Sequence, residues 1–448
     1  MRRLACPSVM EPMQTGDGLL ARIPPPERSI SPATWREMAR ASARHGNGQL
    51  EVTARGSLQV RGLTEASSAR FAADLQEAGL ELPGAPVIHA SPLRGRDPQE
   101  EVDVTPAVRE LRAAFEGALD SGALHPKLSV VLDGGGALSL DALYADVRLR
   151  ARPGSRGQRL DVSVAGTAED GAPLGCIGSR HAASVATALL AAIAREGRRA
   201  RARSVLEERG ADGLRSEIEP WLVDVPPTAD RGRVPAAEVL GGHALRGGRL
   251  AVGLEPAFGA CHVDAFDALL DLAEERGVEA LVPVPGRAFL LVGIPSSKRR
   301  EVQCRAQGLG FVTDPTDPRR SLVACSGAPS CASAALQTRA LAPDIARAAD
   351  ALLDGSLRIH LSGCPKGCAH PRAAALTLVA HPDGFGVVIG GDAAGAAEGR
   401  ILEVHLPEAL ARLARSVRAD ASRASAADHL NRCGAEGVRA LLLERADA

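Results

Sequence analysis

Two stretches of the chain share one arrangement of apolar and polar positions. Residues 16–63 begin with an apolar segment (GDGLLARIPPP). A segment with apolar and small side chains at helical spacing follows (TWREMARASARHGNGQ), and then one with strand alternation (LEVTARGSLQVRGL). Residues 248–294 repeat this order in GRLAVGLEP, FDALLDLAEERGVE and ALVPVPGRAFLLVGI. The patterns predict two copies of a strand–helix–strand module.

A second pair of similar segments follows the modules. The block at 127–151 (KLSVVLDGGGALSLDALYADVRLRA) resembles the block at 359–391, and both read as strand-rich. Helical tails at 188–218 and 410–443 also resemble each other. Pro- and Gly-containing segments at 152–159 and 223–234 are candidate joints, the second of which separates the halves. The chain is therefore interpreted as two homologous α/β halves.

Composition narrows the class of protein. A length of 448 residues favours about two to four domains, and 45% apolar with 24% charged residues indicates a folded globular chain. Aromatic residues make up 2% and the net charge is -1, which disfavours nucleic-acid and anionic-membrane partners. No apolar run reaches the length of a membrane span, and the start lacks an apolar leader, so a cytoplasmic location is expected.

Four of the nine cysteines have ligand spacing. Cys325 and Cys331 are separated by five residues, and Cys364 and Cys368 by three. The first-half segment that matches LSGCPKGC at 361–368 is LSVVLDGG at 128–135, which has no cysteine, so the thiols belong to one copy only. Four thiolates suit a [4Fe-4S] cluster, whereas four-thiolate zinc sites usually show shorter spacings and a disulfide pair is less favoured. The other cysteines are expected to be small buried hydrophobes: Cys6, Cys176, Cys261, Cys304 and Cys433.

The two cysteine pairs on a duplicated chain resemble the sulfite and nitrite reductase haemoprotein family over nearly the whole sequence. The resemblance implies an α/β (α+β) fold with pseudo-twofold symmetry, built from ferredoxin-like half-modules at 13–80 and 235–300 and larger sheet-and-helix domains at 81–222 and 301–448. It also implies a [4Fe-4S] cluster on the four cysteines, with Cys368 bridging to the iron of sirohaem in the reductases.

The family's anion-binding cations are only partly present. The segment TARGSLQVRG resembles the one that carries a substrate arginine, which falls on Arg55, and Lys127 in HPKLS matches a substrate lysine. The other two cationic positions fall on Ser129 and Pro86. Reduction of a small oxyanion requires several cations to stabilise the anion. We therefore expect that the scaffold and the cluster are kept while sulfite reduction is lost.

One branch of the family, the precorrin-3B synthases of aerobic cobalamin synthesis, resembles the chain in CPSVMEPMQTGDGLLARI and IHLSGCPKGCAHP. This resemblance implies O2-dependent hydroxylation of precorrin-3A at C20 with γ-lactone formation, using the cluster and a mononuclear non-haem iron. No G-x-G-x-x-G fingerprint opens a helix, so a separate electron-donor reductase is expected. The alternatives are a sirohaem-dependent sulfite or nitrite reductase, or a non-catalytic electron carrier or tetrapyrrole-binding module.

A tetrapyrrole fringed with carboxylates requires surrounding cations. The candidates are Arg55, Arg61, Lys127, Arg148, Arg150 and Lys366. Arg55 and Arg61 would share a face of one regular strand, and Arg148 and Arg150 also fit a solvated strand face. Imidazole ligands to a non-haem iron would come from His89, His125, His360 or His370, each of which is more often a surface or hydrogen-bonded histidine. The sequence selects no ligand set and no catalytic residue.

Overall fold

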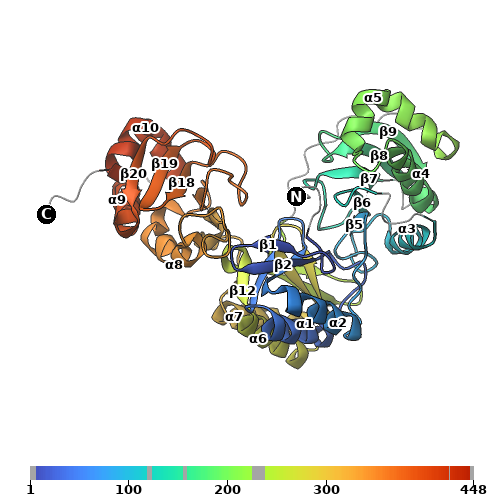
Figure 1. Cartoon of the computed structure of the whole chain (residues 1–448), viewed down its shortest axis with the longest axis horizontal. Helices are drawn as coiled ribbons and strands as arrows, with labels where there is room; N and C mark the ends of the chain where they lie inside the picture. Colours follow the sequence, from blue (N-terminus) through green and yellow to red (C-terminus); the bar gives the residue numbers. More distant parts are fainter. Residues whose placement is uncertain (1–6, 119–123, 155–158, 225–237, 423, 444–448) are drawn as a thin grey trace.

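The computed structural model describes residues 7–118, 124–154, 159–224, 238–422 and 424–443. Cys6 lies outside these residues, as do parts of both candidate joints. Figure 1 shows three lobes: a lower one with α1, α2, α6 and α7, one with β5 to β9, and one with β18 to β20. Among the described residues, no helix combines the length and apolar character that crossing a membrane requires.

The first half-module forms a sheet covered by two helices. Its sheet has the order β1-β2-β4-β3-β12, and its last strand comes from the second half of the chain. The elements are β1 (Met13–Thr15), β2 (Gly18–Ile23), α1 (Pro32–His45), β3 (Gln49–Val52), β4 (Leu58–Leu63), α2 (Glu65–Glu77) and β12 (Ala260–His262). Helix α1 begins where the Ser31 hydroxyl accepts the Thr34 N–H, with proline in the first turn.

The second half-module repeats this plan, as the sequence predicted. The sheet order is β10-β11-β14-β13, and β15 pairs with β11. The elements are β10 (Gly241–Ala244), β11 (Arg249–Pro256), α6 (Val263–Glu275), β13 (Ala280–Val284), β14 (Ala288–Pro295), α7 (Arg299–Gly308) and β15 (Phe311–Val312).

One detail of the sequence prediction was wrong. The last segment of each module was predicted to be a single strand, but it forms a hairpin of two strands, β3 and β4 in the first module and β13 and β14 in the second. In the first module the chain turns between Val52 and Leu58, where the Thr53 N–H donates to the Ser57 carbonyl at 2.8 Å and Gly56 has φ +77°. Arg55 therefore lies in the turn and Arg61 in β4, and they do not share a face of one regular strand.

The two half-modules share one hydrophobic core. The fully buried Trp35 of α1 donates its indole N–H to the Leu281 carbonyl of the other half at 2.8 Å. Its ring meets Phe266 edge to face, with the ring centroids 6.5 Å apart. Strand β12 also pairs with β3 across the halves. The lower lobe is therefore a single packed unit made from both halves.

The two larger sheets have identical topology. In each, the first three strands run parallel and the last two antiparallel. The first contains β5 (Val87–Ala90), β6 (Ser129–Asp133), β7 (Ala145–Ala151), β8 (Arg159–Gly166) and β9 (Ala172–Gly178), with helices α3 (Thr105–Ala118), α4 (Ala182–Arg195) and α5 (Ala202–Arg215). The second contains β16 (Leu322–Ala324), β17 (Ile359–Ser362), β18 (Leu376–His381), β19 (Gly384–Ile389) and β20 (Gly399–Leu402), with α8 (Thr338–Ala348), α9 (Leu406–Ala419) and α10 (Ala426–Leu443).

Strand register shows which positions correspond between these sheets. The Ser91 N–H donates to the Leu132 carbonyl at 3.1 Å, and the Cys325 N–H donates to the Leu361 carbonyl at 3.2 Å. Ser91 in the first large sheet therefore occupies the position that corresponds to Cys325 in the second. This register corrects the match made from the sequence, in which Leu361 corresponded to Leu128. In the structure Leu361 corresponds to Leu132. The glycine directly after the strand end, Gly363, corresponds to Gly134.

Candidate functional site

Two adjoining loops bring the four cysteines of the predicted cluster together. Cys325 and Cys331 lie after β16, and Cys364 and Cys368 lie after β17, its parallel neighbour in the sheet. Parallel strands end at the same sheet edge. The loops are joined by a hydrogen bond from the Ala335 N–H to the Gly363 carbonyl at 2.9 Å, and by one from Lys366 Nζ to Ser333 Oγ at 2.8 Å.

The thiols influence one another. Burial raises the pKa of Cys368, and the negative charges of Cys364, Cys331 and Cys325 raise it further. Cys325 Sγ accepts the Gly363 N–H at 3.0 Å and lies 3.2 Å from Thr338 Oγ1. Within the described ranges, no three Cys, His, Asp or Glu side chains are close enough to hold one metal ion. A cubane instead gives each iron its own thiolate, so it needs no such close group.

Glycines allow the two loops to approach closely. A Cβ atom on Gly363 would lie 2.7 Å from Ala334 Cβ and 3.2 Å from Cys325 Sγ. Gly327 has φ +70°, and a Cβ there would lie 2.5 Å from the Thr338 backbone nitrogen. The donor set of four soft thiolates, the close loops and the amide bonded to sulfur fit a [4Fe-4S] cluster.

The first half keeps the same backbone arrangement without the thiol. Ser91 Oγ accepts the Gly134 N–H at 2.8 Å, as Cys325 Sγ accepts that of Gly363. Ser91 Oγ also donates to Asp133 Oδ1 at 3.2 Å. The pseudo-symmetry therefore places a hydroxyl where the second half places a thiol.

The remaining described cysteines lie apart from these loops, and none of the described cysteines is in a disulfide. Cys176 is buried and Cys433 half-buried. Burial raises the pKa of the Cys261 thiol to about 12. Cys304 is exposed on α7, so the prediction of a buried hydrophobe was wrong there. Its side chain lies on the outer face of a surface helix.

Arg55 extends from the lower lobe to the first large sheet. Its Nη2 donates to the Tyr144 carbonyl at 2.9 Å and lies 3.4 Å from His89 Nε2. The turn that carries it pairs with Pro285, at the tip of the hairpin in the other half-module. Lys127 is exposed two residues before β6, and its N–H donates to His125 Nδ1 at 3.0 Å. Both predicted substrate cations therefore border the first large sheet.

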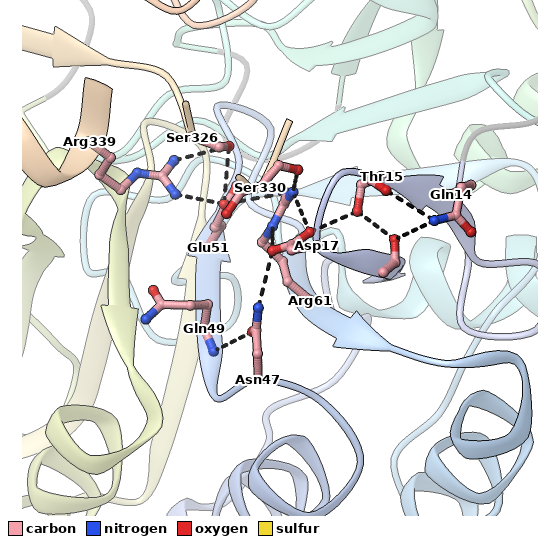
Figure 2. A network of polar contacts seen from close by, with 11 residues as sticks. Gln14, Thr15, Asp17, Asn47, Gln49, Glu51, Arg61, Ser326, Ser330 and Arg339 are labelled. Carbon is pink, nitrogen blue, oxygen red and sulfur yellow. Dashed lines mark hydrogen bonds and ion pairs between the residues drawn. The ribbon is translucent and has the colours of Figure 1, made fainter. Parts of the chain in front are cut away.

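Arg61 is enclosed by protein groups. Its side chain is 5% exposed and pairs with Asp17 at 3.0 Å and with Glu51 at 3.5 Å. It also donates to the Ser330 carbonyl, in the loop that holds Cys331 (Figure 2). Because these partners surround the guanidinium, a substrate contact at Arg61 is not supported.

The other candidate cations have different surroundings. Arg148 is 2% exposed and donates to the Leu140 carbonyl at 3.1 Å, so the reading of a solvated strand face was wrong for it. The neighbouring loop folds over that face of β7 and covers the side chain. Arg150 is half-buried and pairs with Asp141 at 2.8 Å. Lys366 is exposed within the second cysteine loop, between Cys364 and Cys368.

The candidate histidines are dispersed, apart from one pair. His360 and His370 have ring centroids 5.7 Å apart. His360 is fully buried, neither ring nitrogen has a hydrogen-bond partner among the described residues, and burial lowers its pKa to about 4. Burial and the charges of Arg55 and Arg148 lower the pKa of His89 to about 3. Burial also lowers the pKa of His125.

Arg287 contacts the second cysteine loop and was not among the candidates taken from the sequence. It lies at the tip of the hairpin between β13 and β14, with φ +69°, and its Nη2 donates to the Ala369 carbonyl at 3.2 Å. Ala369 directly follows Cys368. Arg287 and Arg55 thus occupy related hairpin tips and contact opposite large domains. An arginine in the turn of both repeated modules was the signal in the sequence.

The two family positions without a cation have protein partners. Ser129 is 2% exposed, and its N–H donates to Asp146 Oδ2 at 2.9 Å. Pro86 follows a cis peptide bond, and its carbonyl accepts from Arg112 at 2.9 Å. Neither position supplies positive charge to an anion.

Comparison with known proteins places the chain in a family. Residues 11–78 match the model of the nitrite/sulfite reductase ferredoxin-like half domain. A precorrin-3B synthase from a Sinorhizobium species is 37% identical over 442 residues, which are 98% of this chain and 94% of that protein. A sulfite reductase (ferredoxin) 2 from Mycolicibacterium paratuberculosis is 25% identical over 379 residues, 78% of this chain and 67% of that protein.

The solved structure of the Mycobacterium tuberculosis NirA protein has the same fold. It superimposes with a TM-score of 0.72 at 19% identity, covering 94% of this chain and 85% of that one. The chain belongs to the precorrin-3B synthases, within the sulfite and nitrite reductase family.

Proposed function

We propose that this chain is an oxygenase that converts precorrin-3A to precorrin-3B. The observation that carries the proposal is the similarity to a precorrin-3B synthase along nearly the full length of both chains. In the proposed reaction one atom of O2 enters C20 as a hydroxyl and the other leaves as water. Two electrons and two protons are consumed, and a ring-A acetate closes the γ-lactone.

The proposed cluster is held by Cys325, Cys331, Cys364 and Cys368. When bound, it would relay electrons from a separate reductase. The chain's own contribution is the pair of loops that meet at Gly363, where an amide donates to Cys325 Sγ at 3.0 Å. Hydrogen bonds of this kind stabilise the charged form of the sulfur.

We assign substrate binding to Arg55 and Lys127. Both border the first large sheet, and Arg55 lies where the two hairpin tips meet. Guanidinium and ammonium groups suit the carboxylates that fringe a tetrapyrrole. Because Ser129 and Pro86 carry no charge, the chain has fewer cations for a small oxyanion, which favours the oxygenase over a sulfite or nitrite reductase.

A mononuclear iron is the second metal that the resemblance implies. Its ligands would come from imidazole and carboxylate groups. The described residues contain no group of three such side chains close enough to share an ion, and the His360–His370 pair lacks a third member. The described residues therefore do not fit this metal, and we assign no step of the reaction to it.

The first test is the visible spectrum of anaerobically purified protein, with pyridine extraction for sirohaem. We expect a broad iron–sulfur absorbance and no extractable tetrapyrrole. Incubation with precorrin-3A, a reductant and isotopically heavy dioxygen should then add one heavy oxygen atom to the product. Tightly bound sirohaem together with sulfite turnover would overturn the proposal in favour of the reductase.

The cluster assignment has its own matched variants. Cys368→Ser should lose iron, sulfide and turnover, because a hydroxyl is a poor ligand for iron of the cluster. Cys304→Ser changes an exposed cysteine on α7 and should leave all three unchanged. Full iron content in Cys368→Ser would contradict the assignment.

A further inference from the structure

The first half-module contacts the loop that holds two of the four cysteines. The Gly16 N–H and the Arg61 guanidinium both donate to the carbonyl of Ser330, the residue before Cys331, and the Gly16 bond is 3.3 Å long. Gly16 lies in the turn between β1 and β2, and Arg61 in β4. Two separate elements of the half-module therefore hold one peptide group of the cysteine loop.

Glu51 of β3 holds the other end of the same loop. Its Oε1 accepts from Ser326 Oγ at 3.2 Å and from Arg339 Nη1 at 2.6 Å. Ser326 directly follows Cys325, and Arg339 is in the first turn of α8, where the loop ends. As Figure 2 shows, Arg61 lies between Glu51 and Asp17 and joins the two contacts into one network.

The network is enclosed and balanced in charge. The side chains of Asp17, Glu51 and Arg61 are 9%, 10% and 5% exposed. Burial opposes ionisation of Glu51, but Arg339 and Arg61 bring its pKa below the usual range. In the same way, Arg61 offsets burial and lowers the pKa of Asp17. Removing one member of such a buried set leaves another charge without compensation.

The fit is also tight at the backbone. A Cβ atom on Gly16 would lie 2.1 Å from the Pro329 carbonyl oxygen and 2.9 Å from the Ala332 nitrogen. These atoms lie on either side of Cys331. An alanine at Gly16 would therefore displace the loop without changing a charge.

We propose that Gly16, Asp17, Glu51 and Arg61 form a clamp that positions Cys325 and Cys331 for cluster binding. The inference rests on the proposed cluster. It makes Arg61 a positioning residue for the metal site and assigns it no substrate contact. Cluster retention then depends on contact between the first half-module and a domain that lies far away in the sequence.

The test uses Arg61→Gln in the full-length protein, with Arg36→Gln as the matched control. Arg36 is a second enclosed arginine of the lower lobe, 13% exposed, and it pairs with Asp267, Asp271 and Glu274 away from the cysteine loop. Cluster loss to an iron chelator is followed by absorbance. We expect Arg61→Gln to lose its cluster about tenfold faster or more, and the control to match the parent protein.

A second variant tests the clamp without removing a charge. Gly16→Ala should also accelerate cluster loss, because the added methyl group displaces the loop. Gly308→Ala is the control, since a Cβ at Gly308 has no atom within 4 Å. Gly16 is exposed in a surface turn, so Gly16→Ala is expected to fold even if Arg61→Gln does not.

Hydrogen–deuterium exchange separates this inference from the proposed function, because it can be measured on cluster-free protein. We expect faster exchange confined to residues 326–335 in both clamp variants. Unchanged exchange and cluster loss would overturn the clamp while leaving the cluster assignment intact. Exchange that rises throughout α1, α2 and α6 would also overturn it, because the network would then stabilise the whole lobe.

Discussion

Replacing Cys325 with serine should separate its role as a ligand from its role in the fold. Cys325 and Ser91 stand at equivalent places, and each accepts a glycine N–H, at 3.0 Å to Sγ and 2.8 Å to Oγ. The serine variant should keep this bond, whose net contribution is about 0.5–1.5 kcal/mol. We therefore expect the unfolding free energy of the cluster-free protein to change by less than about 1 kcal/mol.

The cluster should respond very differently. Without its fourth thiolate the cubane has one iron lacking its soft ligand, so iron and acid-labile sulfide should fall well below those of the parent protein. Urea unfolding of cluster-free protein and iron and sulfide analysis of anaerobically purified protein measure the two effects, with Cys304→Ser as the control. Full cluster content would show that Cys325 is not a ligand. A loss of several kcal/mol in the cluster-free variant would refute its equivalence with Ser91.

Three further predictions concern the shared core, the buried His89 and the substrate cations. Trp35→Phe removes the donor to the buried Leu281 carbonyl and should lower the unfolding free energy by about 1–3 kcal/mol in urea unfolding, whereas no change would argue against a shared core. The pKa of His89 in the folded protein, about 3, lies below its unfolded value of 6.5. Stability should therefore be full above 6.5 and fall as pH drops through this range, and His89→Gln should flatten the profile. Arg55→Ala and Lys127→Ala should raise KM for precorrin-3A without lowering iron content, and equal loss of iron would make either residue structural.

Much of the fold could be predicted because duplication is visible in local patterns. The helical spacing of residues 34–49 and 266–279 reports which side chains face a core, and α1 and α6 occupy those segments. The hairpins were missed, because a continuous run of apolar and polar alternation reads the same whether or not the chain turns back at Arg55 or Arg287. A positive φ angle at the turn is a property of the backbone, and side-chain periodicity does not report it.

The sequence by itself carries the proposed donor set, since the spacing of four cysteines in one half predicts a cluster whatever the path of the chain between them. Only the tertiary structure decided the roles of the arginines. Arg61 and Arg55 look alike in one segment, yet β4 directs the first into a buried network with Glu51, and the turn carries the second to Tyr144. A guanidinium has the same charge in both places. Its role follows from partners far away in sequence, because the energy of an ion pair depends on distance and burial.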